Sequence, residues 1–374
     1  MNLRDYKSVS DRRKALEKEL SVSLKHIGSF SLDEAAASTR NCENMVGVAQ
    51  VPIGVAGPLQ IGSKQYYIPL ATTEGALVAS VNRGCKAMSE SGGALVDSHR
   101  VGATRGPVFR VKDLRESDRL YRFLKDNLED LKKIAEKTSH HLTLQKLMTR
   151  GVGHYRYVRF VFDTADAMGM NMVTIATGAL TSYIERETGV TCLSLAGNFD
   201  IDKKPAWLNV IENRGIKVWT EVTISSSVLK HVLKTTSQKV YEVWLAKCMI
   251  GSAISGSMGF NAQFANIIAA MFLATGQDLG HVGEASCGIT TCEVTSSSGL
   301  YIQVCLPDLM VGTVGGGTGL ATQQEALSIV GAKDSQSFAE VVGAAVLAGE
   351  ISLLASLSEG TLAKAHQQLA RGGK

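Results

Sequence analysis

The sequence predicts an α+β fold, in which a large helix-rich α/β domain is interrupted by a smaller domain and preceded by a helical segment. Three observations predict this arrangement. The chain has 374 residues, which is more than one small hydrophobic core usually serves. Near residue 43 the sequence changes from charged to apolar and glycine-rich. A compact run of alternating strand and helix patterns then fills residues 106–196.

Residues 1–42 carry the charged faces of exposed helices and are expected to form an N-terminal helical segment. The run "ENMVGVAQVPIGVAGPL" that follows is typical of closely packed strands and turns. A helix is predicted next in "TTEGALVASVNRGCKAM", with Thr72 or Thr73 as its N-cap and Glu74 in its first turn.

Residues 106–196 are predicted to form a ferredoxin-like βαββαβ domain. "GPVFRV" is expected to be a strand, and "LRESDRLYRFLKDNLEDLKKIAEK" one amphipathic helix. "HLTLQKLM" and "HYRYVRFVF" alternate like paired strands. A second helix over "ADAMGMNMVTIATGALTSYIERET" and a closing strand "VTCLSLA" complete the order.

The large domain is expected to comprise residues 43–105 and 206–374, joined to the small domain through a loop at 197–205. Its second part contains three predicted helices and a strand. The helices are "SSSVLKHVLKTTSQKVYEVWLAKCM", "GFNAQFANIIAAMFLATGQD" and the apolar stretch 338–357, and the strand is "LYIQVCLP".

Composition excludes several classes of protein. A net charge of +4, without a basic block interleaved with aromatics, argues against nucleic acid as a partner. The 338–357 stretch contains Glu340 and Glu350, so a packed interior helix is expected and not a membrane span. The N-terminus lacks an apolar signal core, and seven scattered cysteines suit a reducing compartment, which predicts a cytoplasmic protein.

Each candidate functional motif also has a structural interpretation. "DAMGMNM" begins a helix and suits a phosphate, but it is also a tight strand–helix turn. "GTVGGGTG" allows close backbone approach to a ligand or forms a flexible surface loop. The pair "KK" in "DIDKKPAW" is either a solvated loop or a cation held for catalysis. His281, Cys287 and Cys292 lack a fourth nearby ligand, so no metal site is predicted.

Together these blocks resemble a known family. "ENMVGVAQVPIGVAGPL", "ATTEGALVASVNRG", "DAMGMNM", "DKKPA", "GQD", "GTVGGGTG" and "AKAH" occur in the order and spacing of hydroxymethylglutaryl-CoA (HMG-CoA) reductases, from about residue 43 to 366. The spellings "DAMGMNM", "DKKPA" and "GGGT" are similar to the class I branch of that family.

The resemblance implies reduction of the HMG-CoA thioester to mevalonate and free CoA by two NADPH. It implies that Lys203 stabilises the oxyanion, that Glu74 relays protons, that Asp278 links the two, and that His366 protonates the CoA thiolate. The substrate residues implied are Ser80, Asn82, Arg83, Arg105, Asn198, Asp202, Lys204 and Asn266. The cofactor residues implied are Ser139, Asp166, Met168, Gly169, Met170, Asn171, Val314, Gly315, Gly316 and Gly317.

Three positions depart from the family pattern. Ala196 stands where a serine is usual, Gln263 where class I members often have a histidine, and His140 where an arginine often reads the 2′-phosphate of NADPH. NADH therefore stays possible as cofactor. The resemblance also implies a dimer or a dimer of dimers. An NAD-linked degradative reductase and a non-catalytic CoA-ester-binding homologue are the alternative functions.

Overall fold

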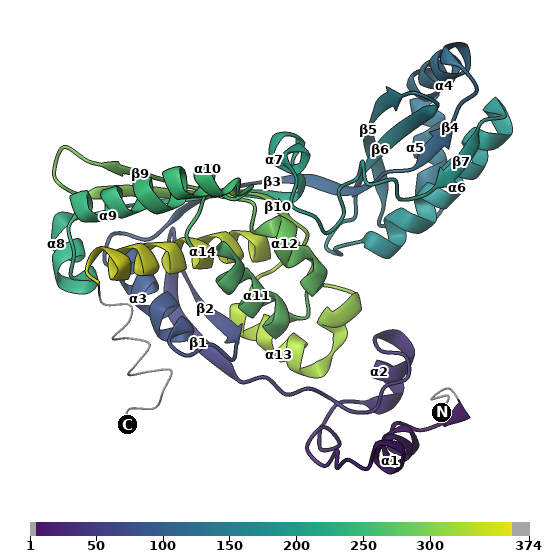
Figure 1. Ribbon diagram of the computed structural model, residues 1–374. Coiled ribbons are helices and arrows are strands. Elements are labelled where there is room, and N and C mark those ends of the chain that lie inside the picture. The colour runs from purple at the N-terminus through teal and green to yellow at the C-terminus, as the bar shows by residue number, and fades with distance from the viewer. Residues whose placement is uncertain (1–4, 361–374) are drawn as a thin grey trace.

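The computed structural model describes residues 5–360, so the predicted catalytic residue His366 lies outside the described residues. Figure 1 shows the arrangement of the elements. The helices are α1 (Val9–Leu20), α2 (Glu34–Arg40), α3 (Leu77–Ser89), α4 (Leu114–Asp126), α5 (Leu128–Glu136), α6 (Met170–Thr188), α7 (Trp207–Glu212), α8 (Ser226–Val228), α9 (Ser237–Trp244), α10 (Ser252–Ser255), α11 (Phe264–Thr275), α12 (Val282–Ala285), α13 (Ala321–Val330) and α14 (Ser335–Ser358). The strands are β1 (Ile53–Ile61), β2 (Lys64–Ala71), β3 (Leu95–Arg105), β4 (Val108–Arg110), β5 (Thr143–Val152), β6 (Tyr155–Asp163), β7 (Thr191–Ser194), β8 (Arg214–Ile224), β9 (Ile289–Val294) and β10 (Leu300–Leu309).

One antiparallel sheet connects the two parts of the molecule. Its strand order is β7-β4-β6-β3-β8-β10-β9, and β5 pairs with β6. Strand β3 pairs with β8 through Leu95–Gly102 and with β6 through Ala103–Arg105. The predicted α+β class is confirmed, and β3 passes without a break from one part to the other.

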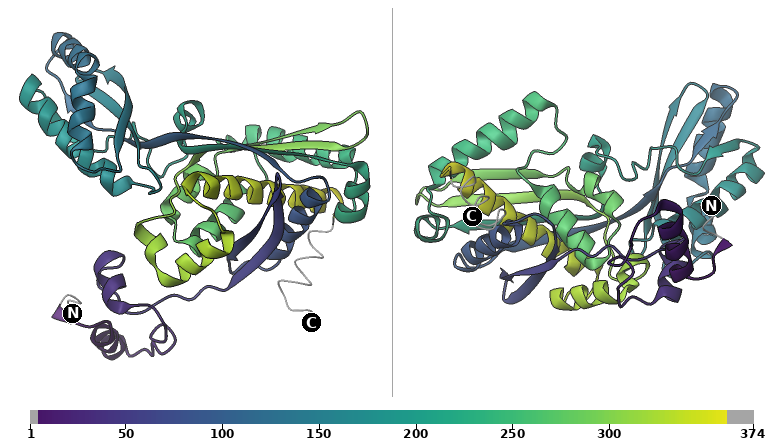
Figure 2. Two further views of the ribbon diagram at one scale, coloured as in Figure 1. Left: turned by 180° about the vertical axis from the view of Figure 1, so that it is seen from behind. Right: turned by 60° about the horizontal axis from the view of Figure 1, so that its bottom comes forward.

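The small part has the predicted strand and helix order, with a hydrophobic core of its own. That core contains Phe109, Phe160 and Phe162 from the strands and Leu120 and Leu180 from the helices. The two ends of this small part lie side by side, because the Gly197 N–H donates to the Gly106 carbonyl at 2.6 Å. Figure 2 shows this part extending away from the rest of the molecule in both views.

The large part is organised around α14, which lies beside α3 and the sheet (Figure 1). Most residues of this 24-residue helix are buried, because it packs on α3, α9, α11 and β8. Gly84 of α3 is needed for this contact, since a Cβ there would stand 1.9 Å from the Ala348 carbonyl oxygen. Helix α14 is long and apolar enough to cross a membrane, but 78% of its most apolar window is buried inside the protein, as in the core helix of a soluble protein.

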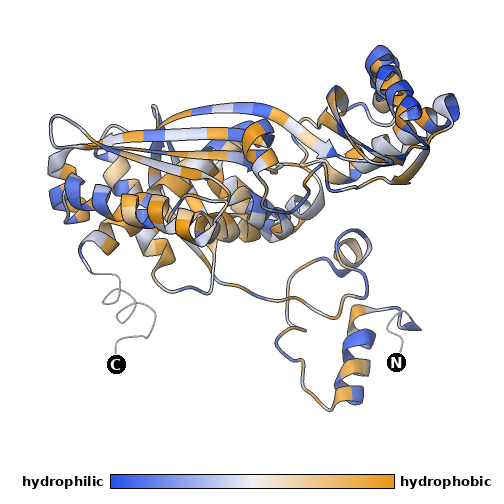
Figure 3. Cartoon of the chain, turned by 45° about the horizontal axis from the view of Figure 1, so that its top comes forward, coloured by the Kyte–Doolittle hydropathy of each residue, from blue (hydrophilic) through white to orange (hydrophobic). Residues whose placement is uncertain are grey.

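The N-terminal segment forms α1 and α2, as the charged helical pattern predicts. Its small cluster of Val9, Ala37 and Met45 packs against Leu320. In Figure 3 α1 carries hydrophilic and hydrophobic residues on different faces. The segment is joined to the large part by the extended chain that precedes β1 (Figure 1).

Two stretches were wrongly predicted to form one continuous helix each. The predicted helix over 114–137 is two helices, because Asn127 leaves helical geometry and its side chain bonds the Phe123 carbonyl. The predicted helix that begins at Ser225 is interrupted at Lys234, which has a left-handed φ of 62°. Its remaining parts include two π-helical turns, Leu229–Leu233 and Leu245–Gly251.

Candidate active site

Lys203 and Asp278, which lie far apart in the sequence, form an ion pair. The Lys203 Nζ stands 2.7 Å from Asp278 Oδ2, and the two side chains are 43% and 33% exposed, so a ligand can reach them. Burial raises the pKa of Asp278, but the hydrogen bonds from Lys203 and from the Gly280 N–H outweigh burial and lower that pKa below its usual value. The carboxylate is therefore held ionised beside the ammonium.

Asp278 follows helix α11 in the sequence, but it lies at the start of a separate short turn. Helix α11 ends at Thr275, and Gly276 turns the chain in a left-handed conformation. Asp278 then caps the short turn Leu279–His281, where its Oδ1 accepts the Gly280 N–H at 2.9 Å. The acid stands at the favourable N-terminal end of that turn.

The loop at 197–205 is held in an unusual backbone conformation. Asn198, Ile201 and Lys203 have positive φ angles of 62°, 49° and 61°, which non-glycine residues rarely adopt. Such geometry persists only where the surroundings fix it. Here the Asp200 carbonyl accepts the Thr104 hydroxyl at 2.9 Å, and the Ile201 carbonyl accepts the Asn209 amide at 3.1 Å.

Beneath the loop lies a buried charged cluster, Arg214, His281 and Glu284, which the sequence analysis did not predict as functional. Glu284 Oε2 accepts the Lys203 backbone N–H at 2.8 Å, and its Oε1 is hydrogen-bonded to both Arg214 and His281. Arg214 also donates to Asp202 Oδ1 at 3.0 Å. The H-x-x-E spacing of His281 and Glu284, directly after "GQD", was the only signal in the sequence.

Three side chains in this region approach one another closely enough to suggest a metal site. Ligand atoms of Asp202, His281 and Glu284 all lie within 4.8 Å of one another. However, the fully buried Arg214 guanidinium already bonds Asp202 and Glu284. A divalent cation there would face that buried cation at short range, so we assign these carboxylates to Arg214.

Arg105, a predicted substrate residue, faces the same loop. Its guanidinium donates to Asp200 Oδ2 at 3.3 Å and lies 3.6 Å from Asp202 Oδ2. Burial of Asp200 raises the pKa of its carboxyl, and Arg105 partly offsets this rise. Lys204 turns back to the Asp202 carbonyl, to which its Nζ donates at 3.0 Å. The structure thus brings Arg105, Asp202 and Lys204 together beside Lys203.

Glu74 stands apart from this group. It was predicted in the first turn of a helix, but α3 begins only at Leu77. The Glu74 N–H instead donates to the Thr72 hydroxyl at 2.9 Å in a turn before the helix. Among residues 5–360 no hydrogen bond or ion pair joins Glu74 to Lys203 or Asp278.

Glu74 borders a hollow of about 430 Å³ that also contains three predicted substrate residues, Ser80, Arg83 and Asn266. Arg83 Nε donates to the Ser352 hydroxyl of α14 at 3.0 Å, and Ser80 donates to the same hydroxyl at 3.0 Å. Gln263, which replaces the frequent histidine, lines this hollow and bonds the Gly349 carbonyl. We call this the Glu74 pocket.

The remaining predicted substrate residues have separate positions. The Asn82 side chain accepts the Gly57 N–H at 3.0 Å, which ties α3 to β1. Asn198 lies in the loop with its left-handed φ. A second hollow of about 430 Å³ opens beside Pro205, with Lys247 and Asn261 in its wall. Lys247 is a further cation near the loop that the sequence analysis did not single out.

The predicted cofactor residues converge. The Asp166 carbonyl accepts the Thr313 N–H at 2.8 Å, and Ala167 pairs with Val314 in a parallel bridge. The "DAMG" segment and the glycine loop 314–317 therefore lie side by side. Gly312 is required at this contact, since a Cβ there would stand 2.4 Å from the Met168 backbone nitrogen.

The start of α6 has the properties of an anion site. Gly169 precedes this 19-residue helix in a left-handed conformation, and no side chain caps its first turn, which contains Met170 and Asn171. The Asp166 carboxylate is bound elsewhere, by the backbone N–H and hydroxyl of Ser335 at 3.0 and 3.1 Å. Ser139 reaches the same turn through a 3.6 Å contact with Met172 Sδ.

Gln277 links the two predicted regions and was not predicted as a functional residue. Its side chain accepts the Gly312 N–H and donates to the Gly312 carbonyl, each at 2.9 Å. It stands next to Asp278 and is almost fully buried. The glycine loop and the Lys203–Asp278 pair are therefore held by neighbouring residues.

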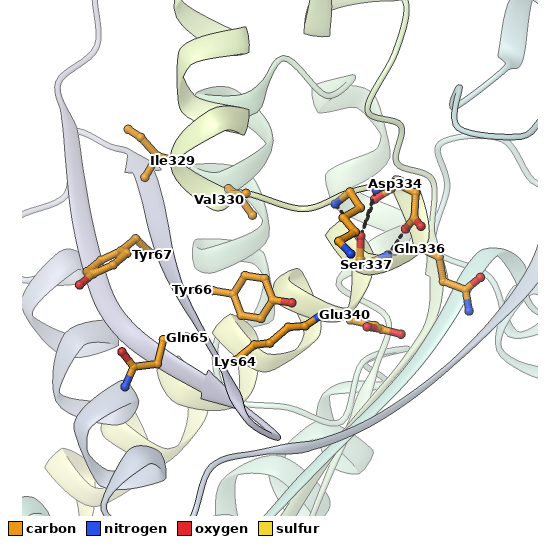
Figure 4. Close-up of a pocket in the computed structure, with 12 residues that line it drawn as sticks. Lys64, Gln65, Tyr66, Tyr67, Ile329, Val330, Asp334, Gln336, Ser337 and Glu340 are labelled. Carbon is orange, nitrogen blue, oxygen red and sulfur yellow. Dashed lines mark hydrogen bonds between the residues drawn. The ribbon is translucent and has the colours of Figure 1, made fainter.

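A further hollow of about 640 Å³ lies away from the predicted site residues. It is bordered by β2, the end of α13 and the start of α14 (Figure 4). Asp334 closes the N-terminus of α14 by accepting the Ser337 N–H at 2.7 Å, so that helix end is not free for an anion. The predicted residues instead cluster along the 197–205 loop, the Glu74 pocket and the start of α6.

Comparison with known proteins decides the family. The family model described as hydroxymethylglutaryl-coenzyme A reductase matches residues 8–371.

This chain belongs to the HMG-CoA reductase family.

Curated relatives named 3-hydroxy-3-methylglutaryl-coenzyme A reductase match nearly the whole chain. The protein of Methanothermobacter thermautotrophicus is 48% identical over 373 residues, which cover 98% of this chain and 94% of that protein. The protein of Pyrococcus abyssi is 48% identical, with 96% and 92% covered. Reductase 1 of Dictyostelium discoideum is 41% identical and covers 98% of this chain and 69% of its own length.

The fold also matches a solved member of the family. The class II reductase of Streptococcus pneumoniae, whose structure was determined with NADPH bound in open conformations, superposes with a TM-score of 0.73. The match covers 95% of this chain and 98% of that one at 17% sequence identity, so it establishes the shared fold.

Proposed function

We propose that this protein reduces (S)-HMG-CoA to (R)-mevalonate and free CoA with two NADPH, a step of the mevalonate route to isoprenoids. The observation that carries the proposal is the accessible Lys203–Asp278 ion pair, at 2.7 Å, in a chain that matches the family over residues 8–371. Neither a degradative direction nor a non-catalytic role has a feature of the structure in its favour.

The chemistry places one main demand on Lys203. Reduction of a thioester to an alcohol takes four electrons, and NADPH, when bound, supplies them as two successive hydrides. Negative charge then develops on the former carbonyl oxygen. An ammonium has three donors, and with one of them engaged by Asp278 the others are free to bind that oxygen.

Proton supply is assigned to two further residues by the resemblance. We propose that Glu74 delivers protons to the reacting oxygen from its pocket beside Ser80 and Arg83. We propose that His366, outside the described residues, protonates the departing thiolate, because a thiolate of pKa ~8.5 left free could attack the aldehyde.

In this proposal the two parts of the molecule bind different ligands. We propose that residues 43–105 and 206–374 bind the CoA ester and that residues 106–196 bind the cofactor, with 197–205 as the catalytic connection. Ser80, Asn82 and Arg83 are assigned to CoA. Arg105, Asn198, Asp202, Lys204 and Asn266 are assigned to the hydroxymethylglutaryl group.

The structure offers a suitable site for NADPH. The uncapped start of α6 presents backbone N–H groups to a phosphate, and the 314–317 loop, in which three of the four residues are glycines, lies against it. Ser139, Asp166, Met168, Gly169, Met170 and Asn171 are the cofactor residues proposed. Because His140 replaces an arginine, Lys137 is the cation proposed for the 2′-phosphate, and NADH is tested beside NADPH.

We further propose that the chain belongs with the class I branch. This proposal rests on the spellings "DAMGMNM", "DKKPA" and "GGGT", which are similar to that branch. A cytoplasmic location is proposed as well, since all seven cysteines are free thiols. Burial raises the pKa of Cys85, Cys248 and Cys292 to about 12, which makes these thiols unreactive.

A homo-oligomer, either a dimer or a dimer of dimers, is proposed because Glu74 and Lys203 are not in contact within the described part of one chain. Size-exclusion chromatography with light scattering should give at least twice the 39.9 kDa of the chain. A fully active monomer would refute this part of the proposal.

The decisive experiment is a direct assay of the purified protein. HMG-CoA is mixed with NADPH or with NADH, and loss of the reduced cofactor is followed by absorbance. Oxidation of two cofactors for each CoA released is expected, faster with NADPH. No oxidation with either cofactor would eliminate the reductase assignment.

A further inference from the structure

The buried cluster of Arg214, His281 and Glu284 has no role in the chemistry described so far. The side chains of Arg214 and His281 are 0% exposed and that of Glu284 is 1% exposed. Buried charges are costly, and one attested role of such groups is to fix a specific arrangement. The arrangement they contact is the Lys203 loop and Asp278.

Glu284 acts on the backbone of the loop. Its Oε2 accepts the Lys203 N–H at 2.8 Å, at the residue whose φ is 61°. Its Oε1 is bonded by Arg214 and by His281 Nδ1, so the carboxylate itself has little freedom to move. Burial lowers the pKa of Arg214, but the nearby carboxylates outweigh burial and raise that pKa, so the guanidinium stays charged. These carboxylates are Glu284, Asp308, Asp202 and Asp200.

His281 acts on the side chains. Its Nε2 is buried without a hydrogen-bond partner among the described residues, and it faces two carboxylates. Asp278 Oδ2 is 3.7 Å away and Asp202 Oδ1 is 3.8 Å away. Asp278 Oδ2 is the same oxygen that binds Lys203. A movement of about 1 Å would bring Nε2 within hydrogen-bond range of it, and such bonds often tighten only when a substrate is bound.

We propose that His281 is a positioning residue, which holds Asp278 Oδ2 through Nε2 and so orients the Lys203 ammonium, while Glu284 fixes the ring through Nδ1 and the loop through the Lys203 N–H. The charged groups that face the ring are Asp202, Asp278, Glu284 and Arg214. This inference rests on the proposed reductase function.

Two substitutions of His281 distinguish the roles of its two ring nitrogens. His281→Gln keeps an amide donor near the position of Nε2, whereas His281→Asn keeps a donor only near Nδ1. We expect His281→Asn to lower kcat about 10-fold with KM for HMG-CoA within about twofold. His281→Gln should retain most of the activity. If the kcat of His281→Asn equals or exceeds that of His281→Gln, the proposal is wrong. It is also wrong if His281→Asn changes KM for HMG-CoA and leaves kcat unchanged.

A double-mutant cycle tests whether His281 acts through Asp278. In an Asp278→Asn background, the further change His281→Asn should cost less than about twofold in kcat. If the two substitutions act independently, so that their separate reductions in kcat multiply in the double variant, the proposal is overturned. His154→Asn is the matched control, because this histidine bonds the Val111 carbonyl in the small part, far from the loop in the chain. Should His281→Asn fail to fold, the same cycle with Glu284→Gln replaces it.

A measurement without catalysis keeps this inference separate from the proposed function. Acetylation of lysines, followed by mass spectrometry, reports how firmly each amine is held. In His281→Asn, Lys203 should react at least about twofold faster than in the wild type, with Lys217 unchanged. An unchanged Lys203 rate refutes the positioning role even if the protein proves inactive with HMG-CoA.

Discussion

The Lys203 loop and the Glu74 pocket each contain part of the predicted catalytic set. They differ in how firmly the structure holds the catalytic residue in place. Lys203 is fixed by an ion pair, by a backbone bond to a buried carboxylate and by a left-handed φ. Glu74 lies in a turn before α3, beside a hollow, and its backbone N–H donates to the Thr72 hydroxyl. The fold of one chain therefore fixes the Lys203 ammonium in position, whereas it places Glu74 in a separate pocket.

The largest effect expected concerns the loop. Lys203→Ala should lower kcat about 1,000-fold, because it removes the charge that stabilises the oxyanion, while binding of HMG-CoA stays within a few fold. Steady-state kinetics and calorimetric binding measure the two effects. Lys217→Ala is the control, because this lysine lies over the Trp219 ring and not among the proposed site residues. Near-normal kcat in Lys203→Ala would transfer the oxyanion role elsewhere.

Substitution of Glu74 in the Glu74 pocket should lower the rate without changing the stability of the fold. Glu74→Gln is expected to lower kcat between about 100- and 1,000-fold through loss of proton transfer. Since the described residues give the Glu74 carboxylate no structural partner, the melting temperature should not change. A large loss of stability would break the comparison, because it would show that Glu74 supports the fold.

Asp278→Asn tests the loop by both rate and pH. We expect kcat to fall about 100-fold, because an amide holds the ammonium less firmly. The folded-state pKa of Asp278 lies below 3.8, so its stabilising effect is complete above that pH and is lost as the pH falls through the lowered value. The unfolding free energy of the variant should therefore depend less steeply on pH below about 4. Equal pH dependence in both proteins would contradict the assigned ion pair.

The smallest effect expected is at Ala196, where the family usually has serine. Ala196→Ser should lower KM for HMG-CoA about threefold, through one added hydrogen bond to the substrate carboxylate. The Ala196 N–H already donates to the Ser194 hydroxyl at 3.2 Å, so Ser194→Ala shows whether that neighbour supplies the missing hydroxyl. An unchanged KM in both variants would exclude position 196 from substrate binding.

Much of the fold could be predicted because its signals are local. Alternation and amphipathic periodicity give the βαββαβ order of residues 106–196. The same signals failed at Lys234, where the helical pattern of the sequence continues but the residue has a left-handed φ and ends the helix with a bond from its N–H to the Leu229 carbonyl. The position of Glu74 was missed for a related reason, since the Thr72 hydroxyl satisfies its N–H in a turn and not in a helix.

The candidate site could be predicted only in part. Lys203 and Asp278 were identified by resemblance, and the structure shows them in contact. Glu284 bonds Lys203 across 81 positions and Arg214 across 70, and no local pattern indicates such a pairing. Gln277 was hidden in the same way, because its role depends on the backbone of Gly312, which lies 35 positions away.

The junction at Gly106 and Gly197 has a consequence for how the chain folds. The pairing of β3 with β8 must bring together residues separated by the entire small part, a closure that is entropically slow in an open chain. The small part is contiguous in sequence and has its own core, so it can form early during synthesis. Once formed, it holds Gly106 against Gly197 and shortens the effective loop, so that the insert acts as a folding template for the sheet that carries the site.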